Sequence, residues 1–483
     1  MRLDELVAAA PEVDRVVGDG AVEIADLAFD SRKAGPGTLF FCVPGASVDG
    51  HDFALDVVEA GAAALVVERE LVLDAPQVVV GDARAAMAPL AARFYGDPTA
   101  RLRTVGVTGT NGKTTTAFLV REILEAAGLQ CGLLGTVKQV VGGAEEPVVR
   151  TTPEAIDLQA TFARMLEGGD RACALEVSSH ALSLHRADAI HFDVAVFTNL
   201  TQDHLDFHVT MEEYFQAKRR LFTEHHPRVA VVNVDDSYGA RLAGEIECVT
   251  FSAAGAAADF SASRVSFDAA GAALLVAGHE LQTRLPGDFN VANALGAYAA
   301  ALALGVRAEE AAAALAVAPR VPGRFEPVEE GQDFAVLVDY AHTPDSMVNV
   351  LRAARRLTPG RVISVFGAGG DRDSDKRPKM GRAGGELSDL AVVTSDNPRS
   401  EEPARIAAEV AAGAAAGTAE VEVEIDRRAA IALALARAEP GDTVVIAGKG
   451  HEDYQEFEGG RRIDFDDRAV AREELRKLAG AAR

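Results

Sequence analysis

The chain has 483 residues, of which 48% are apolar, and a formal net charge of −25. This length exceeds what one hydrophobic core usually organises, so we expect a globular protein with two to four domains. The strong negative charge would repel a phosphodiester backbone, which argues against nucleic acid as a partner. Anionic small substrates would need local basic pockets.

The start of the chain and its cysteines indicate where the protein works. Residues 1–5 are acidic and no apolar segment follows them, so we expect no signal peptide. No apolar run reaches the roughly 18 residues of a membrane span, and we expect a soluble, cytoplasmic protein. The cysteines form no CxxC pair, which argues against a zinc site and a disulfide framework. We expect core thiols at Cys42, Cys131, Cys173 and Cys248.

Three stretches of the chain differ in character, and we predict domains over 1–100, 101–323 and 324–483. The first has short apolar runs at 63–67 and 78–80 and an Ala-rich helix pattern before Gly96. The second has strand patterns at 103–108, 172–177, 194–197 and 229–232, with a helix over 113–127. The third has apolar runs at 335–338, 362–366, 390–393 and 443–446, and the Ala-rich segments 296–318 and 404–416 predict helices. Continuous apolar strands alternating with helices indicate α/β sheets covered on both faces.

A phosphate-binding loop is predicted between the strand pattern at 103–108 and the helix that begins at Lys113. Backbone amides and the helix dipole favour an anion there, Lys113 neutralises phosphate charge, and Thr114 can bind magnesium. The general GxxxxGK[ST] pattern has glycine where this chain has Val107. A Gly-rich turn with a surface lysine is the alternative. The loop residues are Gly109, Thr110, Asn111, Gly112, Lys113, Thr114 and Thr115.

Polar residues also follow two other predicted strands, where loops of a parallel sheet face the ligand crevice. Glu176 ends the strand at 172–177 and is a candidate magnesium ligand, with a surface helix-capping acid as the alternative. The segment 198–208 follows the next strand and contains Asn199 and His204. Beyond it, the pattern at 214–222 predicts an amphipathic helix whose basic residues would ordinarily be solvated.

These motifs resemble those of the Mur ligases and their folylpolyglutamate synthase relatives: GxTGTNGKT at the loop and NLxxDHLDxH at 199–208. The resemblance implies ATP, two magnesium ions, Asn199 beside the phosphates, and Lys113, His204 and Lys218 as catalytic residues. It implies metal binding by Thr114, Glu176, His204 and Lys218, with Lys218 carbamylated by carbon dioxide. Further nucleotide-contacting positions that the resemblance implies are Asn290, Asn293, Arg324, Asp339 and His342.

The resemblance covers the whole chain, and it implies a small N-terminal α/β UDP-binding domain, a central P-loop ATPase-like parallel sheet with helices on both faces, and a C-terminal Rossmann-like α/β domain. Folylpolyglutamate synthases lack the first of these. Residues 30–32 and the pattern from Gly45 to Phe53 match its motifs, with Ser31 a candidate contact. Candidate contacts to a UDP-linked muramyl dipeptide are Thr151, Thr152, Ser178 and Arg186.

The third domain contains the sequence DNPR at 396–399, which resembles the signature of family members that add meso-diaminopimelate. That amino acid has a distal carboxylate which lysine lacks, and an arginine can bind it with two charge-assisted hydrogen bonds. We expect Arg399 to do so. Candidate residues of the same pocket are Arg372, Asp396, Asn397, Pro398, Arg399, Gly448 and Glu452.

The implied reaction joins meso-diaminopimelate to the D-Glu carboxylate of UDP-MurNAc-L-Ala-D-Glu through an acyl phosphate, and the implied protein is a monomer. Three alternatives stay open. The same reaction with L-lysine would change only the amino-acid pocket. A different ligase, such as the pentapeptide-forming Mur ligase or a folylpolyglutamate synthase, disagrees with the N-terminal and DNPR motifs. A nucleotide-gated switch would not need two further domains with basic pockets.

Overall fold

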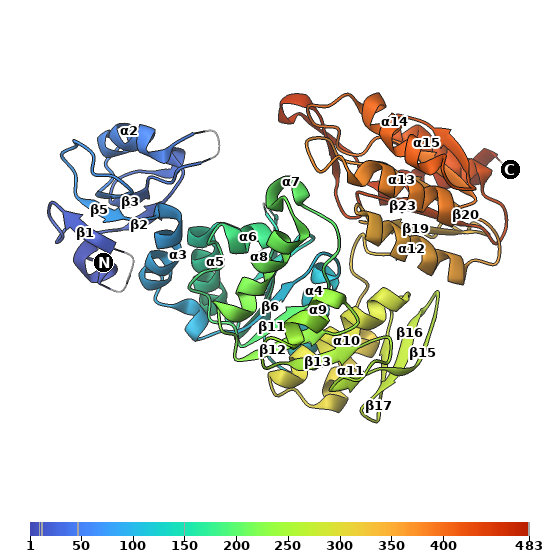
Figure 1. The fold of residues 1–483 in the computed structure, drawn as a ribbon, viewed down its shortest axis with the longest axis horizontal. Helices are drawn as coiled ribbons and strands as arrows, with labels where there is room; N and C mark the ends of the chain where they lie inside the picture. The colour runs from blue at the N-terminus through green and yellow to red at the C-terminus, as the bar shows by residue number, and fades with distance from the viewer. Residues whose placement is uncertain (9, 11–12, 46–47, 149, 482–483) are drawn as a thin grey trace. The chain divides into compact units, whose positions relative to one another are not determined.

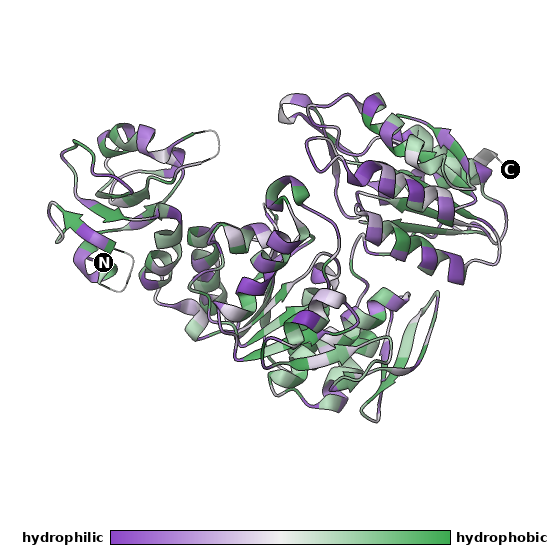
Figure 2. Ribbon diagram, in the orientation of Figure 1, coloured by the Kyte–Doolittle hydropathy of each residue, from purple (hydrophilic) through white to green (hydrophobic). Residues whose placement is uncertain are grey.

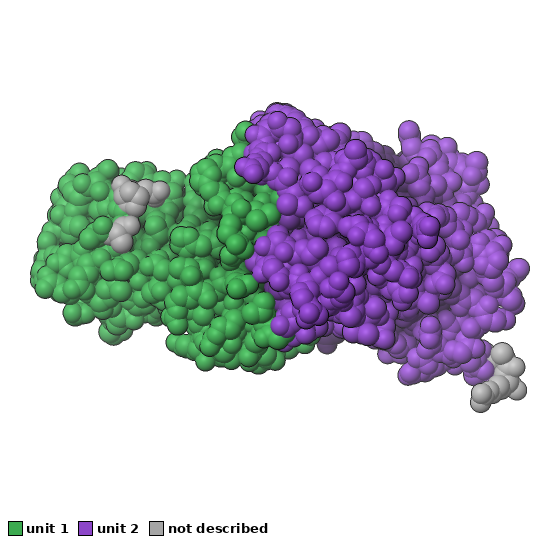
Figure 3. Space-filling view, turned by 90° about the horizontal axis from the view of Figure 1, so that it is seen from below, with its two compact units in different colours: residues 1–108, 128–195, 217–230 green, residues 109–127, 196–216, 231–483 purple. Residues whose placement is uncertain are grey.

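The structure, a computed structural model, describes residues 1–8, 10, 13–45, 48–148 and 150–481. The chain divides into two compact units. The first comprises residues 1–108, 128–195 and 217–230, and the second comprises 109–127, 196–216 and 231–483 (Figure 3). The division passes through β11 (Val194–Phe197), β12 (Val229–Asn233) and α8 (Met211–Thr223). The predicted domain boundaries near 100 and 323 stay a prediction.

The first unit begins with a five-stranded sheet in the order β1-β5-β4-β3-β2, in which only β1 is antiparallel to its neighbour (Figure 1). Its strands are β1 (Val13–Val17), β2 (Asp26–Ala28), β3 (Thr38–Phe41), β4 (Ala64–Val67) and β5 (Gln77–Val80). Leu39 and Val66 pack with α3 on one core, and Phe40 and Leu65 pack with α2 on another. The helices are α1 (Leu3–Val7), α2 (Ala54–Glu59) and α3 (Ala83–Phe94), with the 3-10 turns η1 (Ser31–Lys33), η2 (Gly50–Phe53) and η3 (Pro98–Ala100).

The rest of the first unit is built on five further strands in the spatial order β6-β10-β7-β8-β9. β10 is parallel to β6 and β7, and the other two strands form an antiparallel edge. These strands are β6 (Arg103–Thr108), β7 (Cys131–Leu134), β8 (Gln139–Val141), β9 (Ala144–Glu146) and β10 (Ala172–Glu176), and the helices are α5 (Ala155–Glu167) and α6 (Ser179–Ser183). The strands predicted at 103–108 and 172–177 are therefore confirmed.

The second unit begins with α4 (Lys113–Ala126), which packs against α10 (Asp288–Ala303) and α11 (Ala308–Val317). These three helices confirm the ones predicted from residue 113 and over 296–318. Parallel β13 (Val249–Ser252) and β14 (Phe260–Ser261) follow α7 (Leu205–His208) and α9 (Ser237–Ala243). No prediction covered the antiparallel sheet of β15 (Ser263–Asp268), β16 (Gly271–Val276) and β17 (His279–Thr283).

The C-terminal part of the second unit is a six-stranded sheet in the order β18-β19-β23-β20-β21-β22, parallel except for β18. Its strands are β18 (Glu326–Pro327), β19 (Ala335–Asp339), β20 (Val362–Phe366), β21 (Leu390–Val393), β22 (Glu420–Val423) and β23 (Thr443–Ala447), and β24 (Tyr454–Glu456) pairs with β25 (Arg462–Asp464) beside it. Helices cover both faces, as predicted: α12 (Pro344–Leu357), α13 (Lys376–Leu387) and α14 (Pro403–Ala414) on one, α15 (Arg427–Arg437) and α16 (Asp467–Ala481) on the other.

The burial pattern explains why these segments form a covered sheet. Leu337 faces the α12–α14 side, while Val336 and Val338 face the α15–α16 side, as the alternation of a strand requires. Figure 2 shows the strands mostly in green between helices that carry purple faces. The predicted α/β fold class is therefore confirmed. The cysteines Cys42, Cys131 and Cys173 are buried, as predicted, whereas Cys248 is only partly buried.

Among the residues that the structure describes, none of the helices combines the length and apolar character that a bilayer crossing needs.

Candidate functional site

The loop between β6 and α4 has a backbone that only glycine allows at its last position. Gly112 lies in the left-handed region at φ +85°, and a Cβ atom there would overlap the amide oxygen of Asn293. Lys113 begins α4, and its ammonium donates to the carbonyls of Gly109 and Thr110 at 2.9 and 2.8 Å. The loop thus provides a narrow backbone cradle at a helix N-terminus, which suits a phosphate.

Asn199 lies directly against this loop. Its side-chain oxygen accepts from the backbone N–H of Asn111 at 2.9 Å, and its Nδ2 donates to the Asn111 carbonyl at 3.1 Å. The Asn111 side chain in turn donates to Asp345 of α12 at 2.9 Å, and burial raises the pKa of that carboxyl. The structure thus brings Asn199 and the predicted loop together, and it adds Asp345, which the sequence reasoning missed.

A buried carboxylate, Asp203, collects several cationic groups. Lys376 Nζ lies 3.7 Å from its Oδ1, and the Nε2 atoms of His204 and His342 lie 3.4 and 3.9 Å from its Oδ2. Burial would raise the pKa of Asp203, but these neighbours hold it well below its ordinary range, whereas burial and Lys376 lower the pKa of His342. The cluster orients two predicted site histidines, and sequence reasoning missed both Asp203 and Lys376.

Arg324 connects the start of the third predicted domain with the phosphate loop. Its Nη2 donates to the hydroxyl of Thr114 at 2.9 Å, and its guanidinium lies 4.5 Å from the ring centroid of Tyr340. Asp339, whose pKa is raised by burial, accepts from the backbone N–H of Phe325 at 2.7 Å and so anchors the segment beside Arg324. Two predicted nucleotide contacts, Arg324 and Asp339, therefore lie in one hydrogen-bonded region with Thr114.

Glu176 lies in the first unit, at the end of β10, and is only 1% exposed. It accepts from the backbone N–H of Thr136 at 2.6 Å and from the Thr136 hydroxyl at 3.1 Å. The alternative of a surface helix-capping acid is therefore wrong. Thr152 donates to the carbonyl of Glu176 at 2.8 Å and Thr136 contacts Thr151 at 3.0 Å, so two of the predicted substrate residues lie around this strand end.

Arg186 belongs to a basic cluster centred on Glu154 in the same unit. Glu154, at the start of α5, is 6% exposed and pairs with Arg84 at 3.2 Å, Arg150 at 2.6 Å and Arg186 at 2.9 Å. Burial lowers the pKa of the Arg186 guanidinium. Three cations on one carboxylate leave an excess of positive charge, which suits an anionic substrate. Sequence reasoning found Arg186 but missed Arg84 and Glu154.

Lys218 is buried in the first unit. It lies on α8 and is 1% exposed, beside the buried residues Leu221 and Phe222 of the same helix. Lys218 therefore does not belong to a solvated face of this helix, which was the ordinary alternative for its basic residues. Lysine is rarely buried to this degree, which makes the position a candidate for a role in the chemistry of the site.

In the C-terminal sheet, three of the predicted pocket residues, Asp396, Asn397 and Glu452, interact with a buried lysine. Lys449 is fully buried, and its Nζ donates to Glu452 at 3.0 Å and to the side-chain oxygen of Asn397 at 3.1 Å. Burial opposes the ionisation of Asp396, but the charges of Lys449 and Arg427 hold its pKa below the ordinary value. We expected Asp396 and Glu452 to bind the ammonium group of the substrate. In the structure both already interact with the ammonium group of Lys449. Lys449 stands two residues after the apolar strand β23, and the sequence reasoning assigned it no role.

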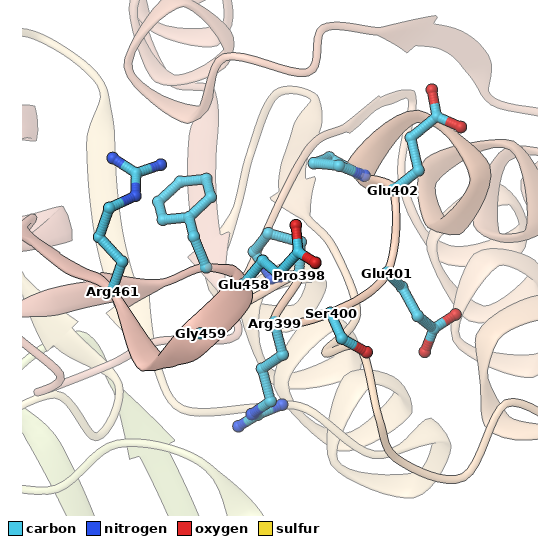
Figure 4. A pocket seen from close by; sticks show the side chains of 10 residues that line it. Pro398, Arg399, Ser400, Glu401, Glu402, Glu458, Gly459 and Arg461 are labelled. Atoms are coloured by element: carbon cyan, nitrogen blue, oxygen red, sulfur yellow. The ribbon is translucent and has the colours of Figure 1, made fainter.

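Arg399 lies at the edge of a cavity of about 620 Å³, together with Pro398 (Figure 4). Its Nη1 donates to the carbonyl of Gly370 at 2.7 Å, and Figure 4 shows its guanidinium pointing away from that of Arg461. The cavity mixes cations and carboxylates, which suits an amino acid. Its lining is Pro398, Arg399, Ser400, Glu401, Glu402, Pro403, Phe457, Glu458, Gly459 and Arg461.

Three further predicted site residues are Arg372, Ser31 and Ser178. Arg372 is exposed and donates to the carbonyl of Asp371 at 3.0 Å. Ser31 opens the 3-10 turn η1. Ser178 caps α6 by accepting from the N–H of Ala181 at 3.1 Å. Positions 46 and 47 of the N-terminal motif lie outside the described residues.

The predicted metal ligands are Thr114, Glu176, His204 and Lys218. In the described part of the chain, no group of three or more His, Cys, Asp or Glu side chains could hold a metal ion. Thr114 and Glu176 still offer a hydroxyl and a carboxylate, the donor types that magnesium prefers.

Family models match three segments of the chain. Residues 23–95 match the Mur ligase family catalytic domain, residues 107–301 the Mur ligase middle domain, and residues 323–450 the Mur ligase glutamate ligase domain.

Curated relatives extend over nearly the whole chain. The chain is 49% identical to UDP-N-acetylmuramoyl-L-alanyl-D-glutamate–2,6-diaminopimelate ligase of Streptomyces coelicolor, over 99% of this chain and 96% of the relative. It is 48% identical to the ligase of the same name from Geobacillus kaustophilus, over 94% of this chain and 95% of the relative.

Solved structures agree with this relationship. A structure of UDP-N-acetylmuramoyl-L-alanyl-D-glutamate–2,6-diaminopimelate ligase matches 99% of both chains with a TM-score of 0.70 and 31% identity. MurF from Acinetobacter baumannii, at 20% identity and a TM-score of 0.67 over 99% of this chain and 98% of its own, shares the fold. The chain therefore belongs to the Mur ligase family, whose members are ATP-dependent ligases.

Proposed function

We propose that the chain ligates meso-2,6-diaminopimelate to the D-Glu carboxylate of UDP-N-acetylmuramoyl-L-Ala-D-Glu, giving UDP-MurNAc-tripeptide, ADP and phosphate for peptidoglycan synthesis in the cytoplasm. The observation that carries this proposal is the 49% identity, over 99% of the chain, to a ligase whose name states those substrates. The sequence Asp396-Asn397-Pro398-Arg399 supports the choice of amino acid.

The first step is attack of the D-Glu carboxylate on the γ-phosphate of ATP. Both partners are anionic, so the loop around Lys113 must hold the phosphates and offset their repulsion. This role is supported by the close backbone approaches at Gly109 and Gly112 and by the hydrogen bond from Arg324 to Thr114, all within the second unit. ADP leaves and an acyl phosphate forms.

Magnesium fits the oxygen donors of this chain. The proposed ligands are Thr114 and His204 in the second unit and Glu176 and Lys218 in the first, the last after its deprotonated amine takes up carbon dioxide and releases a proton to give an anionic carbamate. Bound magnesium would neutralise phosphate charge during transfer. The burial of Lys218 supports the carbamate, because lysine is rarely buried to this degree and a buried lysine is often one whose amine has a chemical role.

In the second step the amine of the amino acid attacks the acyl carbon, phosphate leaves, and the amide bond forms. We assign the distal carboxylate of meso-diaminopimelate to Arg399, with Asn397 and Glu452 orienting its polar groups. Lysine would leave the Arg399 guanidinium unpaired and bring a like charge beside it, so selection is partly repulsive.

The test is a parallel assay with UDP-N-acetylmuramoyl-L-Ala-D-Glu, ATP and magnesium, in which meso-diaminopimelate or L-lysine is offered and phosphate and product mass are followed. Product with meso-diaminopimelate alone supports the whole proposal. Product with L-lysine alone supports the ligase activity but contradicts meso-diaminopimelate as the amino-acid substrate. Absence of product with both contradicts the proposal and favours another ligase of the family.

A further inference from the structure

Two loops of the C-terminal sheet are tied to each other by hydrogen bonds. Gly370 donates its N–H to the carbonyl of Asn397 at 2.9 Å, and Ser400 donates to Asp371 through its N–H at 3.2 Å and its hydroxyl at 2.6 Å. Arg399 adds the bond to the Gly370 carbonyl. A side chain at position 370 would overlap the Pro398 carbonyl, so the loops are in close backbone contact.

Arg377 lies beneath both loops and is almost completely buried, at 1% exposure. Its two terminal nitrogens bind Glu401 at 2.7 and 3.0 Å, in the fork geometry that only arginine provides. The same guanidinium donates to Glu409 of α14 at 2.9 Å and to the Gly369 carbonyl at 3.4 Å.

Glu401 links Arg377 to the loop that contains Gly370 and Asp371. Its Oε1 accepts from the backbone N–H of Asp371 at 2.7 Å while it also accepts from Arg377. The guanidinium holds the pKa of Glu401 at about 2, so the carboxylate stays charged at neutral pH. One buried cation therefore ties, through Glu401, the loop that carries Arg399 to the backbone of Asp371 in the other loop.

We infer that Arg377 is a positioning residue that sets the selection of the amino-acid substrate by holding the Arg399 guanidinium in place. Arg377 lies too deep in the fold to bind the substrate itself. A displacement of about 1 Å in a binding group can lower a rate by up to about a hundredfold. Loosening the two loops would therefore weaken the binding of a distal carboxylate by Arg399. This inference rests on the proposed function.

The experiment compares Arg377→Met with a matched control, Arg405→Met. Arg405 lies on α14, is exposed, and pairs with the same Glu409 at 3.4 Å, but in the described part of the chain its side chain donates no hydrogen bond to Glu401 or to either loop. The KM values for meso-diaminopimelate, ATP and the UDP-linked dipeptide are measured together with kcat. Arg377→Lys is added because it keeps the charge but cannot form the fork to Glu401.

For Arg377→Met we expect the KM for meso-diaminopimelate to rise about tenfold or more, with kcat changed less than about threefold and the other two KM values unchanged. Arg377→Lys should be intermediate and Arg405→Met like wild type. An unchanged KM for meso-diaminopimelate, or an equal loss for all three substrates, overturns the inference. Wild-type protein that forms no product with meso-diaminopimelate contradicts the proposed function instead.

A second readout does not depend on the substrate. Amide hydrogen exchange of Gly370, Asp371, Arg399 and Ser400 reports directly on the tie between the loops. We expect faster exchange in Arg377→Met and not in Arg405→Met, and equal exchange in both overturns the inference. If Arg377→Met does not fold, Glu401→Gln removes the same charged pair from the other side and is measured in the same two ways.

Discussion

Arg324 donates a hydrogen bond of 2.9 Å to the hydroxyl of Thr114, a residue 210 positions away in the sequence. The same guanidinium rests on the ring of Tyr340. A cation from the start of the third predicted domain is thus held at the residue that follows the loop lysine, where the phosphates of ATP are expected.

Arg324→Ala should raise the KM for ATP about tenfold or more, because it removes charged hydrogen bonds of about 1.5–3 kcal/mol each. Steady-state phosphate release at varied ATP checks this. Tyr340→Phe is the control, since it keeps the aromatic ring beneath the guanidinium and should leave the KM for ATP unchanged. An Arg324→Ala enzyme with a normal KM for ATP would remove Arg324 from the nucleotide site.

Lys218→Ala should lose most activity, and added bicarbonate should not restore it, because the variant has no amine to carbamylate. The assay is phosphate release with and without bicarbonate, alongside ¹³C NMR of protein incubated with ¹³C-bicarbonate, in which only wild type should show a carbamate signal. Arg219→Gln, the next residue on α8, is the control. A fully active Lys218→Ala would mean that Lys218 has only a structural role.

Arg399→Ala should weaken the use of meso-diaminopimelate by more than tenfold, on the scale of about 2 kcal/mol for a lost charged hydrogen bond. The measurement is kcat/KM for meso-diaminopimelate and for L-lysine. Arg461→Ala is the matched control, because it removes the other guanidinium of the same cavity. Unchanged kinetics in Arg399→Ala would contradict the assignment of the distal carboxylate.

Acid should remove the contribution of Glu401 to stability. Its pKa in the fold is about 2, below its ordinary value of 4.5, so the ionised form is favoured by folding. That contribution is present above pH about 5 and is lost as the pH falls toward 2. The thermal midpoint of Glu401→Gln should therefore lie below that of wild type at pH 7, and the difference should shrink by pH 3. A constant difference would show that Glu401 does not act through its charge.

The sequence predicted the parallel strands because each is a continuous apolar run, as at β19 and β20, and the loop at 109–115 because its glycine and lysine spacing is specific. It could not predict the burial of Lys218 or Lys449, since helical or strand spacing places a lysine on a face without saying what covers that face. Contacts such as that of Asn111 with Asp345 depend on tertiary packing between segments 234 residues apart. The role inferred for Arg377 depends on two loops that only the fold brings together.

The ammonium group of Lys113 already donates hydrogen bonds to two carbonyl groups of its own loop. Nucleotide binding at this loop, as proposed, would therefore replace carbonyl oxygens by phosphate oxygens around the ammonium. Such an exchange would favour a fully charged phosphate over a neutral ligand, because a charged acceptor forms the stronger hydrogen bond.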